Sequence, residues 1–224
     1  MATSRTYGEA CGIPRALDRV GERWALLVVR ELLLGPKRFT DLKTGLPAAS
    51  PNVLAQRLRE LEQAGIVRKR RLPPPAASQV YELTEWGAEL EPVLVALGRW
   101  GARAPLDPEY MGMSIDSHIV SLATLFDGEL AGDLEASLEL RMGDDVFHAV
   151  VAGGEIDTGR GAPASPDAVL TLEPGTLLGL IHGQFSVAGA VSSGVLVLEG
   201  DRGVVERFVG LFPMPEPAEL PVPA

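Results

Sequence analysis

The sequence is poor in several residue types, and each shortage excludes a class of protein. The 224 residues contain a single cysteine, Cys11, which excludes an internal disulfide framework and a metal site built from several cysteines. Aromatic residues make up only 5% of the chain, so the hydrophobic cores must be built mainly from Leu, Val and Ala. No apolar run approaches the roughly 20 residues of a membrane-spanning helix, and the first residues lack the apolar stretch of a secretory signal. We therefore expect a soluble, cytoplasmic protein with no membrane partner.

Charge is distributed unevenly along the chain. The formal net charge is −10, yet residues 1–104 carry 16 Lys and Arg against 11 Asp and Glu, whereas the remaining 120 residues carry 4 against 19. Such a difference between two halves of a chain indicates two domains with different partners. The basic half can approach phosphate groups, which would repel the acidic half.

Residues 1–104 are predicted to form a mainly helical domain with one strand pair. Gly35-Pro36 is a helix stop, and Ser50 before Pro51 is a good N-cap followed by proline at the first helical position. We expect helices over Gly12–Val20, Trp24–Leu34, Thr40–Lys43 (capped by Thr40), Pro51–Ala64 and from Thr84 to about Arg103, and strands over Ile66–Arg71 and Gln79–Leu83.

The helix predicted over Pro51–Ala64 has a polar face suited to reading DNA. Leu54, Leu58 and Leu61 share one face and must point into the core. This turns Asn52, Gln56, Arg59 and Gln63 outward, with Arg57 beside them. Asn and Gln can pair with adenine edges and Arg with guanine, and Ser50 at the helix N-terminus can hold a phosphate. The order of helix, tight turn and second helix predicts a helix-turn-helix.

A basic hairpin follows the predicted helix-turn-helix. Arg68, Lys69, Arg70 and Arg71 are consecutive, and such a group of like charges repels itself unless a polyanion neutralises it. Lys37 and Arg38 precede the supporting helix and could contact the DNA backbone. The candidate DNA-binding residues are Lys37, Arg38, Thr40, Ser50, Asn52, Gln56, Arg57, Arg59, Arg68, Lys69, Arg70 and Arg71.

Residues 7–103 also carry a family resemblance. The segments that carry it are Cys11-Gly12-Ile13-Pro14, Val20-Gly21-Glu22-Arg23-Trp24, Arg38-Phe39-Thr40-Asp41-Leu42, Leu54-Ala55-Gln56-Arg57-Leu58, Leu61–Val67 and Tyr81-Glu82-Leu83-Thr84 with Gly87. This region resembles the HxlR-type branch of the MarR-like winged helix-turn-helix regulators. It departs from the family in one place, where Gly12 separates Cys11 from the aliphatic and proline positions. The resemblance implies a homodimer, formed by the first and last helices of the domain, that binds double-stranded DNA at a two-fold operator.

The second half is predicted to be an α+β domain over residues 110–212. It follows a linker at Ala104–Pro108 and precedes a loose, proline-rich tail at 213–224. We expect helices over Ser117–Phe126, Pro174–His182 and Asp201–Phe212, and strands over Glu135–Met142, Val146–Ala152, Ala168–Leu172 and Val195–Glu199.

This second domain lacks the signatures of an enzyme. His118, His148 and His182 are too scattered for a metal motif, and the glycine pairs lack the spacing of a phosphate or dinucleotide loop. We expect no catalytic residue, metal or cofactor. Asp167–Leu172, Leu177–Leu180 and Gly194–Asp201 resemble the sterol-carrier-protein type of lipid-binding domain. That resemblance implies an apolar cavity lined by Leu122, Leu125, Phe126, Phe147, Leu177, Ile181, Phe185, Phe208 and Phe212.

Together these features predict a dimeric, DNA-binding transcriptional regulator controlled by a small apolar ligand. One alternative is a regulator that senses oxidants or electrophiles through Cys11, with a purely structural second domain, since a helix start with Arg15 and Arg19 nearby favours the thiolate. A buried, inert cysteine is the simpler interpretation. Another alternative is a lipid carrier or an enzyme that uses the winged helix for protein contacts.

Overall fold

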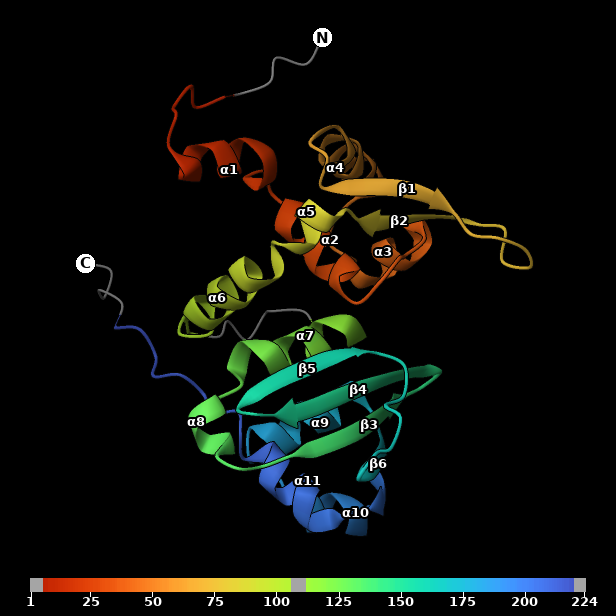
Figure 1. Ribbon diagram of the computed structural model, residues 1–224, viewed down its shortest axis with the longest axis vertical. Coiled ribbons are helices and arrows are strands. Elements are labelled where there is room, and N and C mark those ends of the chain that lie inside the picture. The colour runs from red at the N-terminus through yellow and green to blue at the C-terminus, as the bar shows by residue number, and fades with distance from the viewer. Residues whose placement is uncertain (1–5, 106–111, 220–224) are drawn as a thin grey trace. The chain divides into compact units, whose positions relative to one another are not determined.

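A computed structural model describes residues 6–105 and 112–219 (Figure 1). The chain divides into two compact units, Met1–Leu94 and Val95–Ala224, and the division falls within a single helix, α6 (Glu91–Gly101). The linker predicted at Ala104–Pro108 runs beyond the described residues after position 105. The two-domain layout predicted from the sequence, with a helical N-terminal part and a C-terminal α+β part, is confirmed.

The Met1–Leu94 unit consists of helices and one antiparallel strand pair. Its elements are α1 (Gly12–Val20), α2 (Ala25–Leu33), α3 (Phe39–Gly45), α4 (Pro51–Gln63), β1 (Val67–Arg71), β2 (Gln79–Leu83), α5 (Glu85–Ala88) and the start of α6. Leu54, Leu58 and Leu61 of α4 are at most 1% exposed and pack with α2 and α3 in one core. Strand β1 pairs with β2 so that Val67 lies opposite Leu83 and Arg71 opposite Gln79.

Local signals account for most of the boundaries in this unit. The Ser50 hydroxyl accepts a hydrogen bond from the Val53 amide at 3.3 Å, so the predicted cap of α4 is confirmed. The predicted cap of the preceding helix is wrong. Helix α3 begins earlier than predicted, with Arg38 as its N-cap, because the Asp41 carboxylate accepts from the Arg38 amide at 3.0 Å and leaves Thr40 inside the helix.

The single long helix predicted after Thr84 is also corrected, because the chain forms two helices there. Thr84 caps α5 as predicted, through a hydrogen bond from the Gly87 amide at 3.0 Å. Helix α6 then starts at Glu91. Pro92 explains the break, because proline has no amide hydrogen and its ring would collide with the carbonyl of residue 88 in a continuous helix.

The Val95–Ala224 unit is built on a five-stranded sheet with the order β5-β4-β3-β6-β7. β3 pairs in parallel with β6, and the other neighbours are antiparallel. The strands are β3 (Ala136–Met142), β4 (Asp145–Ala152), β5 (Glu155–Arg160), β6 (Ala168–Leu172) and β7 (Leu196–Gly200). The helices are α7 (Ile115–Leu125), α8 (Gly128–Ala131), α9 (Pro174–Ile181), α10 (Val187–Ser192) and α11 (Arg202–Val209).

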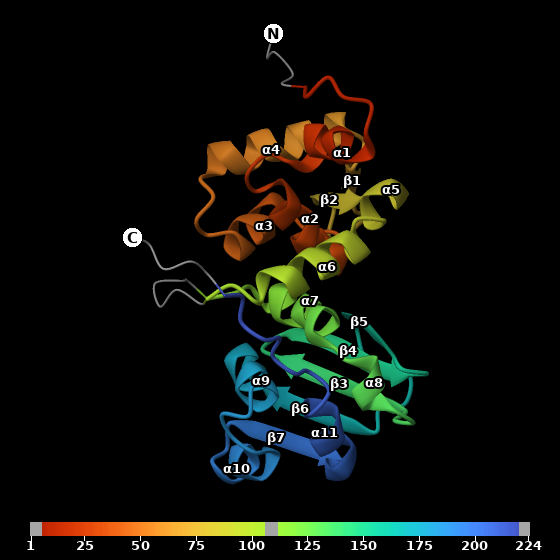
Figure 2. The same ribbon diagram turned by 90° about the vertical axis from the view of Figure 1, so that its left-hand side faces the viewer.

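Alternating burial shows that one face of this sheet forms the core. Leu138 and Leu140 of β3, with Phe147 and Ala149 of β4, are fully buried, whereas their neighbours along each strand are generally more exposed. Helix α7 packs near β5, α10 near β7, and α11 against β3 and β6 (Figure 2). Strand β5 and helices α8 and α10 were not predicted from the sequence. Within residues 6–105 and 112–219, no helix is long and apolar enough to cross a membrane.

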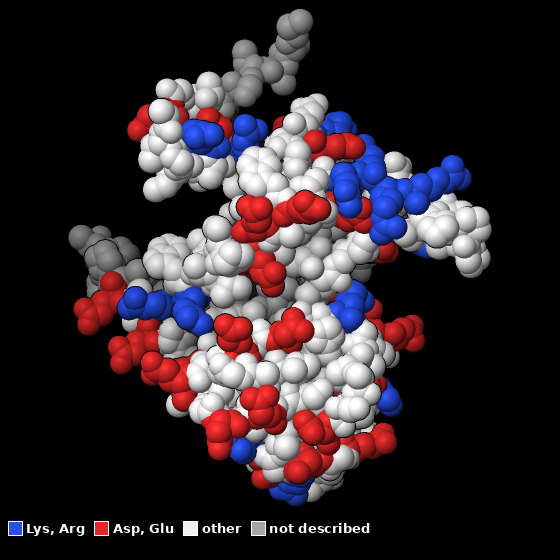
Figure 3. Space-filling model, in the orientation of Figure 1, with Lys and Arg blue, Asp and Glu red and all other residues white. Residues whose placement is uncertain are grey.

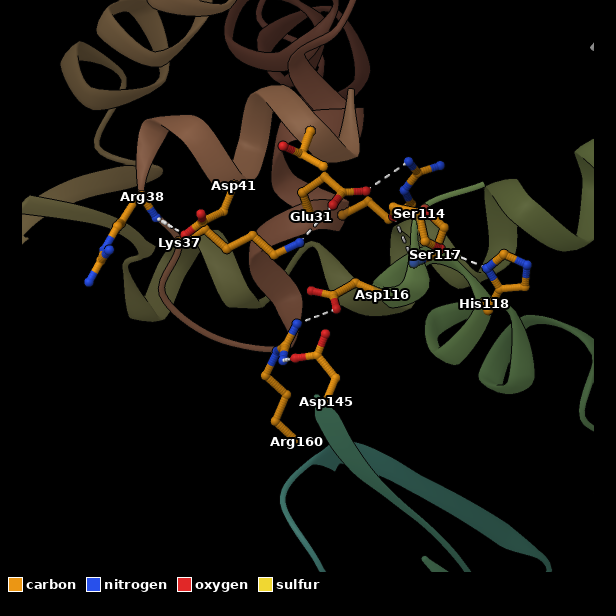
Figure 4. Close-up of polar contacts among 12 residues, drawn as sticks. Glu31, Lys37, Arg38, Asp41, Ser114, Asp116, Ser117, His118, Asp145 and Arg160 are labelled. Carbon is orange, nitrogen blue, oxygen red and sulfur yellow. Dashed lines mark hydrogen bonds and ion pairs between the residues drawn. The ribbon is translucent and has the colours of Figure 1, made fainter. Parts of the chain in front are cut away.

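An arginine joins the edge of this sheet to helix α7. The Arg160 guanidinium contacts the carboxylates of Asp116 and Asp145, each at 2.5 Å, and lies 4.9 Å from the centre of the Phe147 ring (Figure 4). Burial alone would lower the pKa of Arg160, but the hydrogen bond and charge of Asp145 and the charge of Asp116 raise it. Arg160 therefore stays charged and holds β5 and α7 together.

Candidate nucleic-acid interface

Helix α4 presents the polar face that its sequence predicts. Its three leucines are buried, while Asn52, Arg59 and Gln63 are exposed and Gln56 is partly exposed. These four positions follow one another at intervals of three or four residues and therefore share one side of the helix. Val53, next to them, is 37% exposed. The surface thus offers two kinds of hydrogen-bonding group that pair with base edges, an amide and a guanidinium.

The outer side chains of α4 are linked to one another. The Arg59 guanidinium donates to the Gln56 side-chain oxygen at 2.5 Å, and the Gln56 amide donates to the Glu60 carboxylate at 2.6 Å. These contacts order Gln56 and Arg59 before any ligand binds, which lowers the entropy that binding would cost.

Arg57 lies in a different environment from the other candidates on α4. Its side chain is 12% exposed, forms an ion pair with Glu60, and has an Nη1 atom 3.7 Å from the Glu22 carboxylate. Glu22 precedes α2, so Arg57 links α4 to the connection between α1 and α2. The sequence placed Arg57 beside the DNA-reading residues, whereas its contacts in the structure are those of a residue that positions the helix.

The β1–β2 hairpin carries its cations in pairs with acidic side chains. Arg68 Nε donates to one oxygen of Glu82 at 2.8 Å, and Arg70 Nε donates to the other at 2.6 Å. Burial alone would raise the pKa of Glu82, but the hydrogen bonds and charges of Arg70 and Arg68 outweigh it and hold the pKa below its usual value. The Glu82 carboxylate is therefore ionised at neutral pH.

The opposite face of β1 carries a second pair. Lys69 Nζ lies 2.7 Å from a Glu62 oxygen and 5.6 Å from the centre of the Tyr81 ring. The hydrogen bond that Lys69 donates to Glu62 raises the pKa of Lys69 despite partial desolvation. The expectation that only a polyanion could neutralise these cations is therefore wrong, because Glu62 and Glu82 partly do so from within the chain. The cluster still has an excess of positive charge, since Arg71 is exposed beside it.

The remaining candidates lie around α3 and the start of α4. Lys37 is mostly buried, and its ammonium group lies 2.7 Å from the Glu31 carboxylate of α2, as Figure 4 shows. Arg38 is exposed and its Nε donates to the Ser78 hydroxyl at 3.0 Å. Thr40 and Ser50 are also exposed. Arg38, Thr40 and Ser50 can therefore reach a ligand, whereas Lys37 mainly anchors α2.

The two units differ in which charge predominates on their visible surface. Figure 3 shows the blue of Lys and Arg gathered over the β1–β2 hairpin, whereas red predominates on the visible face of the Val95–Ala224 unit. This agrees with the opposite net charges of the two halves of the sequence.

Two helices expose apolar side chains that nothing in the described chain covers fully. Helix α1 buries only Val20 and leaves Ile13 71% and Leu17 43% exposed. Helix α6 has no buried residue, and its Val93, Leu97 and Trp100, which share one face, are 53%, 45% and 73% exposed. Helices of this length are unstable in water without packing, so both faces are suited to a partner.

The candidate cavity residues of the second unit lie mostly inside its core. Phe208 packs between layers with its ring 5.0 Å from that of Phe212, which lies 6.0 Å from that of Phe126. Phe185 packs on Gly179 of α9 so closely that a side chain there would collide with its ring. Of the nine candidates, Leu125 and Phe185 are partly exposed, and the buried ones are Leu122, Phe126, Phe147, Leu177, Ile181, Phe208 and Phe212.

The remaining candidates within the described residues are Cys11 and the possible metal-ligating side chains. Cys11 is exposed and precedes the first residue of α1. Over residues 6–105 and 112–219, no three His, Cys, Asp or Glu side chains gather in a way that could hold a metal ion.

Comparison with known proteins separates the two halves. Residues 19–107 match the family described as HxlR-like helix-turn-helix, and residues 109–218 match the family described as alkyl sulfatase C-terminal. The match for the second half leaves the sterol-carrier likeness unconfirmed. The two matches meet within the linker predicted at Ala104–Pro108.

Several relatives match the first half. The uncharacterised HTH-type transcriptional regulator YvaP of Bacillus subtilis is 36% identical over 97 residues, which cover 43% of this chain and 89% of YvaP. The HTH-type transcriptional regulator YodB of the same organism is 39% identical over 85 residues, which cover 38% of this chain and 76% of YodB.

Two solved structures are also similar in part. The reduced form of YodB has a TM-score of 0.39 and 35% identity, covering 42% of this chain and 94% of YodB. A double mutant of the sec-alkyl sulfatase PisA1 has a TM-score of 0.40 and 21% identity, covering 50% of this chain and 17% of PisA1. The helix-turn-helix with its basic hairpin, the family match and the coverage of YvaP agree, and this chain belongs to the HxlR-like helix-turn-helix family of DNA-binding transcriptional regulators.

Proposed function

We propose that the protein is a homodimeric regulator that binds a two-fold DNA operator through α4 and the β1–β2 hairpin. The observation that carries the proposal is the outer side of α4, where Asn52, Gln56 and Arg59 face away from the leucine core. In this arrangement α4 enters the major groove, Gln56 and Arg59 contact base edges, and the hairpin cations contact phosphates.

The second copy is proposed to cover the apolar faces of α1 and α6. Ile13, Leu17, Leu97 and Trp100 are large apolar side chains at 43% exposure or more, and burying them provides the free energy of association. Two copies also supply two recognition helices, and dimers of such motifs bind half-sites about one DNA turn apart. A single small module buries too little surface for tight, specific binding.

DNase footprinting of the purified protein on the region upstream of its own gene tests the DNA-binding proposal. We expect a protected site with two-fold symmetry. Replacing Gln56 or Arg59 with Ala should raise the protein concentration needed for protection, because each removes a base contact worth about 1–3 kcal/mol, or about 5- to 150-fold in affinity. Arg202→Ala is the matched control, since Arg202 is also an exposed arginine on a helix but lies in the second unit and pairs with Glu206. The proposal would be contradicted if the control variant lost protection, or if the Gln56 and Arg59 variants protected the site as well as the wild type does.

A small apolar molecule is proposed to act on the Val95–Ala224 unit and change DNA affinity. The support is the apolar set around Phe126, Leu177 and Phe208, in a unit whose strongly acidic surface is unsuited to DNA. A ligand shifts DNA binding only if it binds the competent and incompetent states with different affinity. Native mass spectrometry with fatty acids and sterols tests this. If no ligand-bound species is seen and no ligand changes DNA affinity, the proposal of ligand control is wrong.

A second candidate is a regulator that senses oxidants or electrophiles at Cys11. The observation in its favour is that the thiol is exposed and lies at the start of α1, whose apolar face is proposed to meet the second copy. Oxidant-dependent release of DNA by the wild type and its absence in Cys11→Ser would favour this function over ligand control.

A further inference from the structure

One carboxylate bridges two arginines of the hairpin. Arg68 lies directly opposite Glu82 in the strand register, and Arg70 is two residues further along β1 on the same face. The Nε atoms of the two arginines donate to different oxygens of the same Glu82 carboxylate, at 2.8 and 2.6 Å. Both guanidiniums are therefore held at fixed positions relative to each other.

The carboxylate of this bridge is largely buried, whereas its two arginines are exposed to solvent. The Glu82 side chain is 11% exposed, while those of Arg68 and Arg70 are 64% and 45% exposed. A guanidinium has five N–H groups, and a contact through Nε uses one of them. The terminal nitrogens are the fork that binds a phosphate with two hydrogen bonds.

Glu82 has two opposing effects on a phosphate that approaches this fork. It orders both arginines before binding, so less side-chain entropy is lost on binding. Its own negative charge also repels any phosphate nearby, whatever the base sequence. The second effect weakens binding to DNA of arbitrary sequence, where phosphate contacts supply essentially all of the affinity.

We propose that Glu82 is a specificity-determining residue of the DNA interface, which positions Arg68 and Arg70 for phosphate and lowers the affinity for DNA of arbitrary sequence. The inference rests on the proposed function. It extends that function because it assigns a role in DNA discrimination to an acidic residue that does not itself contact DNA.

Binding of the full-length protein to a short duplex of random sequence, followed by fluorescence anisotropy over a range of salt concentrations, tests the charge effect. We expect Glu82→Gln to bind about two- to fivefold more tightly, the size of one partly screened surface charge interaction. The dependence of log K on log salt should become steeper, because phosphates replace the lost carboxylate. Glu85→Gln is the matched control, because Glu85 begins α5 and contacts neither arginine within the described part of the chain.

NMR of the arginine Nε–H groups tests the positioning effect without DNA. In the wild type the assigned Nε–H signals of Arg68 and Arg70 should both be protected from exchange with water. Glu82→Gln should lose that protection while its backbone spectrum stays folded. If Glu82→Gln does not fold, Arg70→Gln replaces it. That variant should lose one signal and leave the Arg68 signal, because Arg68 keeps its own Glu82 oxygen.

The outcomes separate this inference from the proposed function. A wild-type protein that binds neither the random duplex nor its upstream region would overturn the proposed function. A wild type that binds, with Glu82→Gln and Glu85→Gln shifting affinity equally, would overturn the inference and leave the function standing. Absence of both protected Nε–H signals in the wild type would also overturn it.

Discussion

The exposed face of α6 gives the sharpest test of the proposed dimer. Trp100 is 73% exposed, and a tryptophan side chain buries about 150–250 Å² when it is covered. A partner could therefore remove roughly 150 Å² of it from water in each copy. At about 25 cal/mol per Å² this is worth up to ~4 kcal/mol per copy. If the interface covers half of that area, the two copies together contribute about 4 kcal/mol to association.

Replacing Trp100 with Ser should therefore weaken dimerisation by roughly a thousandfold, since each 1.4 kcal/mol is a factor of ten. Sedimentation velocity over a range of protein concentrations measures the change directly. Leu130→Ser is the control, because Leu130 is 55% exposed on α8, outside the proposed interface, and should leave the dimer intact. A wild-type protein that is monomeric at all concentrations, or a Trp100→Ser protein that dimerises as the wild type does, would refute the reasoning.

Three further predictions concern the first unit. Arg57→Met, which leaves the residues Gln56 and Arg59 unchanged, should lower affinity for the upstream DNA, because the contact between Arg57 and Glu22 that positions α4 is lost; a footprint of unchanged strength would contradict the positioning role. Leu58→Ala should lower the free energy of unfolding by about 2–5 kcal/mol, since Leu58 is 1% exposed, and urea unfolding measures it. The ionised Glu82 carboxylate should add to the free energy of unfolding in full above the ordinary carboxyl pKa of about 4.3. This contribution should disappear as the pH falls through the lower pKa of Glu82 in the folded state. Urea unfolding at several pH values measures it, and Glu82→Gln should show a smaller loss of stability in acid than the wild type.

Helix α4 could be predicted from the sequence because its signals are local. Ser50, Pro51 and the spacing of Leu54, Leu58 and Leu61 lie within one segment, and each acts on its own turn of helix. Pro92 is itself a local signal for the break between α5 and α6. The regular spacing of apolar residues on either side of it nevertheless favoured one continuous helix. Strand β5 could not be predicted, because it contains Glu155, Asp157 and Gly159, which are residue types that strands disfavour.

The pairing of the charges could not be predicted in the same way. Arg57 meets Glu22, which belongs to an earlier segment, so its burial depends on the tertiary packing of α4. The contact between Glu82 and two arginines depends on the register of the hairpin, and the loop with its three prolines does not fix that register from sequence alone. The sequence alone therefore cannot distinguish a row of unpaired cations from a row of cations held in ion pairs, because the strand register decides between them.

The break between α5 and α6 has a consequence for how this protein tolerates change. Because an α-helix turns by about 100° for each residue, removing or adding one residue near Pro92 would swing Val93, Leu97 and Trp100 to another side. In the proposed dimer, substitutions on that face would alter how strongly the two copies associate, whereas a change of length at the break would alter the direction in which they meet. We therefore expect insertions and deletions there to be far more damaging than their solvent exposure suggests.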